Sequence, residues 1–245
     1  MTQKIALVTG GMGGIGTAIC KRLAEAGHRV VTTYSTPGKH ADWQARMREQ
    51  GFDIATYQCD VSNFDSCASM VKRVRDELGP VGILVNNAGI TRDGRMQKME
   101  KSAWDDVLRT NLDSVFNVTR QVLDDMCEAN WGRVINISSI NGQKGQFGQT
   151  NYSAAKAGVH GFSMALAQEV AKKGITVNTI SPGYIGTEMV MAVKEEVRNQ
   201  IIAGIPVGRL GKPEEIAALV AFIASDDASF MTGANIAMNG GQHMC

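Results

Sequence analysis

Residues 4–16 read KIALVTGGMGGIG, and this stretch decides the fold. Its first half is a short aliphatic run that ends at Thr9 and predicts a buried strand. Its second half holds five glycines, and residues 14–26 then show apolar side chains at helical spacing up to Gly27. Glycines let a backbone approach a phosphate closely, and the free N–H groups that begin a helix attract the anion. The stretch therefore predicts a dinucleotide-binding turn between strand and helix, with a tight turn that binds nothing as the alternative.

The rest of the chain alternates short β-branched runs with longer helical segments. Strands are expected at residues 4–9, 29–34, 54–59, 83–86, 133–137, 176–180 and 234–238, and helices at 14–26, 42–50, 65–78, 102–129 and 152–173. The fourth of these helices is expected to bend near Asn111. Alternation of this kind predicts βαβ units. The expected fold class is α/β: a single doubly wound, Rossmann-type parallel sheet of seven strands, with helices on both faces, in one domain over residues 1–245.

Two segments interrupt the alternation, and each follows a predicted strand directly. Residues 142–151 are rich in glycine and glutamine, and residues 183–203 form a largely helical insert. Ligands bind at the carboxyl ends of the strands in doubly wound folds, so both segments are expected beside the ligand. The insert is interpreted as a substrate lid. The alternative is an ordinary helix whose methionines fill the core.

Composition excludes several classes of protein. The 245 residues include 25 basic and 24 acidic ones, a net charge of +1 that argues against a nucleic-acid partner. The five cysteines and four histidines show no metal-ligand spacing, so no metal is expected. No apolar run reaches the roughly 18 residues of a membrane span. These features predict a cytoplasmic protein without a membrane partner, its cysteines reduced.

Further motifs follow the glycine turn in a familiar order. Thr9 begins the spacing TGxxxGxG, Asn86-Asn87-Ala88-Gly89 follows the fourth strand, and Tyr152 stands four residues before Lys156. With Asn111, Ser139 and Pro182-Gly183 in register, nearly the whole chain resembles the short-chain dehydrogenase/reductase family. The resemblance implies a bound dinucleotide that contacts Gly10, Met12, Gly13, Gly14, Ile15, Gly16, Asp60, Val61, Asn87, Ala88, Gly89, Ile90, Thr91, Tyr152, Lys156, Pro182, Gly183, Ile185 and Thr187. A simple helix N-cap is the alternative role for Thr187.

The end of the second strand bears on the choice between NAD and NADP. Dinucleotide folds that prefer NAD place an acidic residue there to bind the adenine ribose 2′-hydroxyl. Here the strand ends in Tyr34-Ser35-Thr36, and the first carboxylate comes only at Asp42. Tyr34 and Lys39 are therefore expected to contact a 2′-phosphate, and the predicted cofactor is NADPH/NADP+. A solvated Lys39 without a ligand is the alternative.

Four residues are expected to carry catalysis. Tyr152 and Lys156 share one face of a helix, and the ammonium and the helix N-terminus are expected to move the tyrosine pKa toward neutrality. The family resemblance implies that Tyr152 protonates a carbonyl oxygen, that Lys156 also holds the nicotinamide ribose, and that Ser139 hydrogen-bonds the carbonyl. It also implies that Asn111 holds a water that feeds protons through Lys156. The neighbouring Ser138 is the rival for Ser139.

The loops around the catalytic residues bear on the substrate. They are similar to those of family members that reduce 3-oxoacyl-CoA thioesters, and the implied acyl-CoA substrate is acetoacetyl-CoA. The residues expected to contact it are Asp93, Gln146, Phe147, Gly148, Gln149, Gly183, Tyr184 and Lys194. The rival activity is reduction of a 3-oxoacyl group carried by an acyl carrier protein, and a non-catalytic nucleotide sensor is a more distant alternative. The resemblance also implies a homotetramer.

Overall fold

Seven parallel strands form one sheet in the computed structural model, which describes residues 3–244. The strands are β1 (Ile5–Val8), β2 (Arg29–Tyr34), β3 (Ala55–Gln58), β4 (Val81–Asn86), β5 (Gly132–Ile137), β6 (Ile175–Pro182) and β7 (Asn235–Met238). Their order across the sheet is β3-β2-β1-β4-β5-β6-β7, and every neighbouring pair is parallel. The predicted doubly wound α/β sheet is confirmed.

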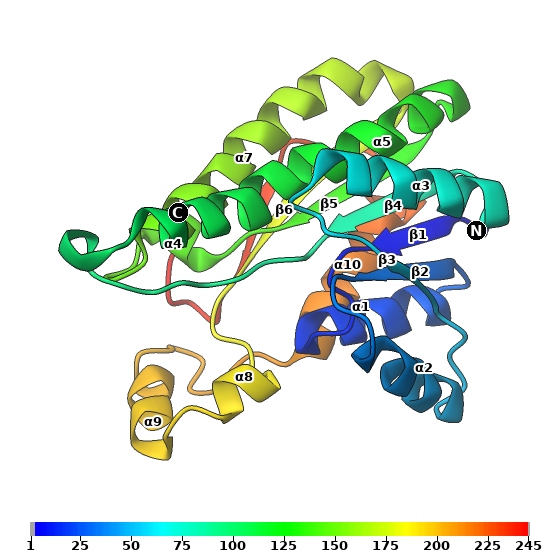
Figure 1. Cartoon of the computed structure of the whole chain (residues 1–245). Coiled ribbons are helices and arrows are strands. Elements are labelled where there is room, and N and C mark those ends of the chain that lie inside the picture. Colours follow the sequence, from blue (N-terminus) through cyan, green and yellow to red (C-terminus); the bar gives the residue numbers. More distant parts are fainter. Residues whose placement is uncertain (1–2, 245) are drawn as a thin grey trace.

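Helices cover both faces of the sheet. They are α1 (Gly14–Glu25), α2 (Lys39–Glu49), α3 (Phe64–Leu78), α4 (Lys101–Leu108), α5 (Ser114–Ala129), α6 (Ile140–Lys144), α7 (Thr150–Val170), α8 (Glu188–Met191), α9 (Glu195–Ala203) and α10 (Pro213–Ala224). In Figure 1, α3, α5 and α7 lie above the sheet, and α1, α2 and α10 lie below it. Helices α8 and α9 stand apart at the lower left. The longest helix is α7, and no helix in the described residues is long and apolar enough to cross a membrane.

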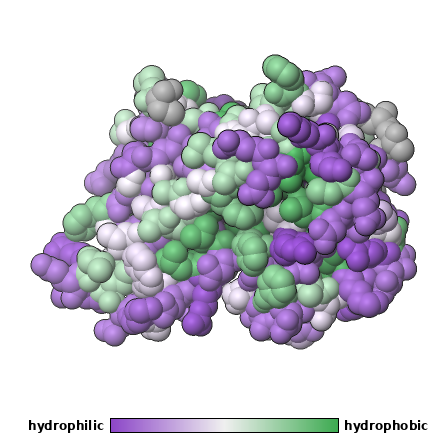
Figure 2. Space-filling view, turned by 90° about the horizontal axis from the view of Figure 1, so that it is seen from above, coloured by the Kyte–Doolittle hydropathy of each residue, from purple (hydrophilic) through white to green (hydrophobic). Residues whose placement is uncertain are grey.

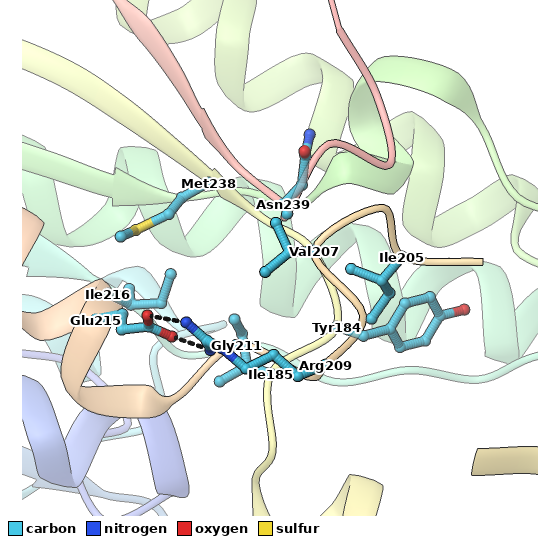
Figure 3. Close-up of a pocket in the computed structure, with 12 residues that line it drawn as sticks. Tyr184, Ile185, Ile205, Val207, Arg209, Gly211, Glu215, Ile216, Met238 and Asn239 are labelled. Atoms are coloured by element: carbon cyan, nitrogen blue, oxygen red, sulfur yellow. Dashed lines mark hydrogen bonds and ion pairs between the residues drawn. The ribbon is translucent and has the colours of Figure 1, made fainter. Parts of the chain in front are cut away.

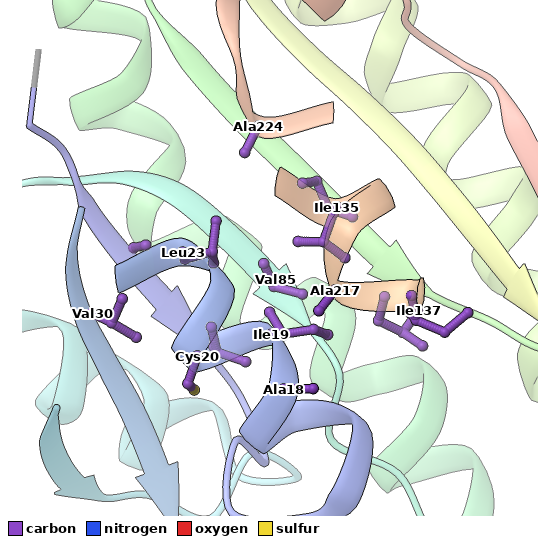
Figure 4. Packing of buried hydrophobic residues seen from close by; sticks show 14 of the residues in the cluster. Ala18, Ile19, Cys20, Leu23, Val30, Val85, Ile135, Ile137, Ala217 and Ala224 are labelled. Atoms are coloured by element: carbon purple, nitrogen blue, oxygen red, sulfur yellow. The ribbon is translucent and has the colours of Figure 1, made fainter. Parts of the chain in front are cut away.

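Side-chain alternation along the strands builds two cores from one sheet. Ala6 and Val8 of β1 pack toward α1, α2 and α10, whereas Leu7 between them packs toward α3, α5 and α7. Figure 4 shows part of the first core, where Ile19 of α1 and Ala217 of α10 meet side chains of the sheet. Successive strand residues point to opposite faces. The nearly continuous apolar runs of this sequence are therefore what a strand buried on both faces requires.

The helical boundaries depart from the sequence-based expectation in three places. The helix expected at residues 102–129 is interrupted by a π-helical turn, Arg109–Asp113, which contains Asn111 and separates α4 from α5. The one-turn helix α6 and the helix α10 were not expected. Pro213 at the start of α10 and Glu215 three residues after Lys212 are start signals that the sequence does carry.

Candidate active site

A cleft of about 850 Å³ lies at the carboxyl ends of the strands, within the roughly 300–1,000 Å³ typical of ligand pockets. It lies where the strand order reverses between β1 and β4, the topological switch point at which doubly wound sheets bind ligands. The structure brings to this cleft Gly10, Met12, Gly13, Gly14, Ile15, Gly16, Tyr34, Asp60, Val61, Asn87, Ala88, Gly89, Ile90, Thr91, Ser139, Gln149, Tyr152, Lys156, Pro182, Gly183, Tyr184, Ile185 and Thr187. The side chain of Lys39 lies outside the described part of the chain.

The glycine turn needs its glycines for close backbone approach. Gly10 has a φ of +63°, a left-handed conformation that side chains disfavour. A Cβ on Gly16 would lie 2.5 Å from the carbonyl oxygen of Gly10, and one on Gly14 would lie 2.9 Å from Cγ2 of Thr187. The side-chain amide of Asn87 holds the turn from the other side, donating to the carbonyls of Thr9 and Gly10 at 3.0 and 3.1 Å. The turn is therefore packed against β4 and against the start of the insert.

The start of α1 fits a pyrophosphate. Gly13 is the N-cap, and the first turn contains no acidic residue. Within residues 3–244, no side chain hydrogen-bonds to this N-terminus as a cap. The first N–H groups of a helix lack partners inside the helix, and they form an anion site when they face a cleft. The residues present therefore suit the phosphates of a dinucleotide.

The end of the cleft where the family resemblance predicts adenosine is formed by residues at the ends of β2 and β3. The ring of Tyr34 stacks on the imidazole of His40, with 3.9 Å between centroids. Asp60 is held in place by its own loop, because its carboxylate accepts hydrogen bonds from the N–H and hydroxyl of Ser62 at 3.0 and 2.7 Å. The end of β2 itself carries no carboxylate, and the residues that it contributes to the cleft, Thr33, Tyr34 and Ser35, all bear hydroxyl groups.

Lys156, Tyr152 and Ser139 meet at the inner end of the cleft. The buried Nζ of Lys156 donates to the carbonyl of Ile137 at 2.7 Å and lies 5.8 Å from the centre of the Tyr152 ring. Ser139 lies two residues after the end of β5 and is the N-cap of α6, where its hydroxyl accepts a hydrogen bond from the N–H of Asn141 at 3.1 Å. The side chain of Ser139 is also close enough to Tyr152 to lower the pKa of its phenol. A substrate oxygen at this point would have two hydroxyl groups within reach.

The protonation behaviour of this pair differs from the expectation. Burial raises the pKa of Tyr152, the Ser139 side chain lowers it, and Asp93 raises it. Burial also lowers the pKa of Lys156 to about 8. The expectation that the tyrosine pKa falls toward neutrality is therefore wrong for the protein alone, because desolvation disfavours both the phenolate and the ammonium.

The lowered pKa of Lys156 predicts a pH-dependent stability. Below about pH 8 the Lys156 amine is protonated in both the folded and the unfolded protein. Between about pH 8 and pH 10.5 it is protonated only in the unfolded chain, which therefore binds more protons. The free energy of unfolding consequently rises with pH over this range. At 1.36 kcal/mol per pKa unit, the rise is about 3 kcal/mol. We expect Lys156→Met to lack it. Urea unfolding of both proteins at about pH 7 and about pH 10.5 measures the difference, and parallel pH dependence in the two would contradict it.

Ser138 and Asn111, two neighbours of the predicted catalytic residues, make hydrogen bonds to other parts of the protein. The hydroxyl of Ser138 donates to the carbonyl of Lys156 at 2.8 Å and lies 2.8 Å from Nε2 of His160, so it faces α7. The amide of Asn111 accepts from the N–H of Ile90 at 2.8 Å and donates to its carbonyl at 2.9 Å. Asn111 thus ties the π-helical turn to the loop after β4, beside the cleft; its water-holding role remains a prediction.

The expected substrate residues are only partly brought together. Gln149 lines the cleft, yet its amide accepts from Nδ2 of Asn141 and donates to the carboxylate of Asp93, both at 2.9 Å. Gln149 therefore links the Ser139 loop to the Asp93 loop. Phe147 is 79% exposed, with the guanidinium of Arg95 at 5.3 Å from its ring. The structure does not place Asp93, Gln146, Phe147, Gly148 or Lys194 in the lining of the cleft.

A smaller pocket of about 170 Å³ adjoins the cleft and shares Gly183, Tyr184 and Ile185 with it (Figure 3). Its walls are mainly aliphatic, and the Tyr184 hydroxyl points away from them in the figure. Arg209 donates two hydrogen bonds to the carboxylate of Glu215 beside it, at 2.8 and 2.7 Å. Ile185 at the start of the insert is buried in the same core cluster as Ile216 of α10, whereas the described residues of α9 are not buried. Met191, one of the two methionines in the insert, is exposed as well; the role of the insert as a substrate lid remains a prediction.

Several residues of the cleft were missed by the sequence-based reasoning. They are Thr33, Cys59, Thr110, Ile137, Ile140 and Asn141, whereas the cleft residues Ser35, Ser138, Glu188 and Val190 belong to segments or alternatives that the sequence had already indicated. Most are immediate neighbours of expected residues, so their position at strand ends was the available signal. Within residues 3–244, no group of three or more potential ligand side chains is arranged to hold a metal ion.

Comparisons with known proteins agree with this geometry. Residues 4–198 match the family described as short chain dehydrogenase. The acetoacetyl-CoA reductase of Allochromatium vinosum is 58% identical over 243 residues, which cover 98% of this chain and 99% of that protein. The acetoacetyl-CoA reductase of Cupriavidus necator is 56% identical over 245 residues, all of both chains. A 3-oxoacyl-[acyl-carrier-protein] reductase of Vibrio cholerae is 44% identical, with 98% of each chain covered.

Proposed function

Because the chain belongs to the short-chain dehydrogenase family, we propose that it reduces acetoacetyl-CoA to (R)-3-hydroxybutyryl-CoA with NADPH and so supplies polyhydroxybutyrate synthesis. The chain is an oxidoreductase acting on a CH–OH group and its carbonyl counterpart. The observation that carries the proposal is the meeting of Ser139, Tyr152 and Lys156 at one end of a dinucleotide-sized cleft. The identity of more than half the chain to two acetoacetyl-CoA reductases supports the choice of substrate.

Ser139 and Tyr152 have separate roles in the proposed reaction. The cofactor, when bound, supplies a hydride to the carbonyl carbon. The hydroxyl of Ser139 donates a hydrogen bond to the carbonyl oxygen and stabilises the charge that develops there. Tyr152 then donates its phenolic proton to that oxygen. A phenol whose pKa is raised by burial is fully protonated at neutral pH and so is ready to act as the acid.

Lys156 and the first turn of α1 hold the cofactor in this proposal. Nζ of Lys156 has three donors, and one is used by Ile137. Another can reach a ribose hydroxyl beside Tyr152. Gly13 and Gly14 offer backbone N–H groups to the pyrophosphate. Residues 183–203 form the lid over the acyl-CoA, and their start already touches the glycine turn through Thr187.

Initial rates on two matched substrates test the proposal. NADPH oxidation is measured with acetoacetyl-CoA and with the same acyl group on acyl carrier protein, followed by the chirality of the product. A higher kcat/KM on the CoA thioester, with the (R) product, supports the proposal. Preference for the carrier-protein substrate would favour the activity named for the Vibrio cholerae relative. If the protein turned over neither substrate, the non-catalytic nucleotide sensor would be the remaining hypothesis.

The cofactor preference has its own test at Tyr34. We propose that NADPH is preferred because no carboxylate stands at the end of β2. Tyr34→Asp is expected to narrow or reverse the ratio of kcat/KM for NADPH to that for NADH, since a carboxylate repels a 2′-phosphate and accepts a hydrogen bond from a 2′-hydroxyl. Steady-state rates with both cofactors measure it. Equal use of NADH by the wild type would defeat the argument.

We propose a homotetramer from the apolar surfaces that the chain exposes. Phe116 of α5 and Met164 of α7 are exposed on one side, and Phe222 of α10 and Phe230 near β7 on another. Figure 2 looks onto the side of α5 and α7 and shows hydrophobic side chains gathered toward its middle. Exposed apolar patches of this kind mark contact surfaces. Light scattering at micromolar concentration should give four times the mass of the chain, and a monomeric mass would refute the assembly.

The cysteines support a cytoplasmic setting. Cys20, Cys59, Cys67 and Cys127 are free thiols. Free thiols are typical of compartments that keep cysteines reduced.

A further inference from the structure

Two cysteines lie side by side at the end of the cleft where adenosine is predicted. Sγ of Cys59 and Sγ of Cys67 are 3.8 Å apart. Cys59 follows β3 and lines the cleft with 2% of its surface exposed, whereas Cys67 lies in the first turn of α3 and is fully buried. The proposed reduction uses neither thiol.

Hydrogen bonds tie this pair of thiols to the segment expected to contact adenine. The hydroxyl of Ser66 accepts a hydrogen bond from the N–H of Asp60 at 3.0 Å. The same hydroxyl donates to Sγ of Cys59 at 3.9 Å. Sγ of Cys67 lies 3.6 Å from the carbonyl oxygen of Val61. The position of the two sulfurs and the position of Asp60 and Val61 are therefore linked.

The surroundings of the two thiols act on their pKa values in opposite directions. Hydrogen bonds from Cys67 and from Ser66 lower the pKa of Cys59, against the opposing effects of burial and of Asp60. The Cys59 interaction and burial raise the pKa of Cys67. A thiol with a stabilised thiolate on the wall of a cleft, next to a protonated partner thiol, is the arrangement of an oxidisable cysteine with its resolving cysteine.

We propose that Cys59 and Cys67 form a peroxide-sensitive dithiol whose closure to a disulfide weakens dinucleotide binding. The Cys59 thiolate attacks one oxygen of hydrogen peroxide. An S–O bond forms, the O–O bond breaks, hydroxide leaves, and Cys59 becomes a sulfenic acid. The Cys67 sulfur then displaces the sulfenic hydroxyl, which leaves as water with the Cys67 proton. The pair loses two electrons, and the peroxide gains them.

Formation of the disulfide requires a movement that would displace part of the cleft wall. Its sulfurs must lie about 2.05 Å apart, whereas they are 3.8 Å apart in the reduced protein. Cys59 is attached to a sheet strand and Cys67 to a 15-residue helix, so the connecting loop has the greatest freedom to shift. Asp60 and Val61 lie in that loop and line the cleft. This inference rests on the dinucleotide site of the proposed function.

The coupling between oxidation and binding is reciprocal. A disulfide that lowers cofactor affinity by some factor must itself be disfavoured by bound cofactor to the same extent. Bound NADPH would also cover Cys59. Saturating NADPH is therefore expected to slow disulfide formation.

The experiment begins with the reduced full-length protein, whose affinity for NADPH is measured by fluorescence titration. Hydrogen peroxide is then added and removed, and the titration is repeated before and after dithiothreitol. Cys59 and Cys67 fall in one tryptic peptide, residues 49–72, which contains no other cysteine. The disulfide therefore appears as the loss of two hydrogens from that peptide. We expect the dissociation constant for NADPH to rise roughly 5- to 150-fold, the usual range of such couplings, and dithiothreitol to restore it.

Cys67→Ser and Cys127→Ser separate this mechanism from general oxidation. Cys127 lies on α5 and is not one of the residues that line the cleft, so its variant should behave as the wild type does. Cys67→Ser should give oxygen adducts on Cys59 without the two-hydrogen loss. The mass of the wild-type peptide shows whether the disulfide forms, so the test does not depend on the folding of Cys67→Ser. Oxygen adducts without a disulfide in the wild type, or a disulfide with unchanged NADPH affinity, would overturn the inference. Failure of the reduced protein to bind NADPH would overturn the proposed function as well.

Discussion

Replacing Tyr152 with phenylalanine is expected to lower kcat/KM for acetoacetyl-CoA by roughly 10²- to 10⁴-fold, the usual contribution of a general acid. The change removes the phenolic proton and leaves the ring, whose centre lies 5.8 Å from Nζ of Lys156. Lys156 keeps its hydrogen bond to the carbonyl of Ile137. The NADPH dissociation constant should therefore stay near the wild-type value, and steady-state rates with fluorescence titration measure both quantities.

Tyr57→Phe is the matched control for this prediction. Tyr57 is also buried, its hydroxyl donates to Glu77 at 2.7 Å, and burial with that hydrogen bond raises its pKa to about 12. It lies outside the cleft lining. Removing this hydroxyl should leave kcat/KM unchanged. If Tyr152→Phe retained activity within tenfold of the wild type, the tyrosine would not be the proton donor.

Replacing Arg133 with alanine is expected to lower the free energy of unfolding substantially, since each buried carbonyl oxygen that loses its donor costs about 1–3 kcal/mol. The guanidinium is 2% exposed and donates to the carbonyls of Gly132, Gly174 and Ser225 at 2.8, 3.2 and 3.3 Å. It also pairs with Asp226 at 3.3 Å. Alanine would leave a cavity and deprive buried carbonyl oxygens of their donors. Urea or thermal unfolding measures the loss.

Two further variants identify the cause. Arg133→Lys keeps the charge but lacks the planar fork of donors, so it should recover only part of the loss. Arg120 is a surface control, since it pairs with Asp124 one helical turn away and both side chains are about half exposed or more. Arg120→Ala should change stability by less than about 1 kcal/mol. Equal losses at the two arginines would show that the buried hydrogen bonds contribute little.

The sequence-based prediction was most successful where a local pattern repeats. Every expected strand has a counterpart. The central strands β5 and β6 are buried along their whole length and could be recognised by their apolar runs, whereas the edge strands β3 and β7 include exposed residues. The prediction failed for α6, which has only five residues and begins because the hydroxyl of Ser139 accepts from the N–H of Asn141. One turn of helix carries too few residues for a periodic pattern. The π-helical turn at Asn111 appeared in the sequence only as a suspected bend.

The candidate site shows the same division between local and long-range information. The glycine turn could be predicted because close approach of the backbone demands glycine at fixed positions. The partners of Gln149 could not be predicted, because Asn141 and Asp93 reach it from separate loops. Its amide was expected to bind substrate, and the structure shows both of its polar atoms in use within the protein.

The sequence by itself determined the alternation of strands and helices, the glycine turn, and the order of Ser139, Tyr152 and Lys156 along the chain. These features depend on residue type and spacing over a few turns of chain. Only the tertiary structure decided that burial raises the pKa of Tyr152 and lowers that of Lys156 to about 8. Desolvation depends on how many atoms from distant segments surround a group. The contact between the sulfurs of Cys59 and Cys67 likewise exists only because the loop after β3 folds back on the start of α3.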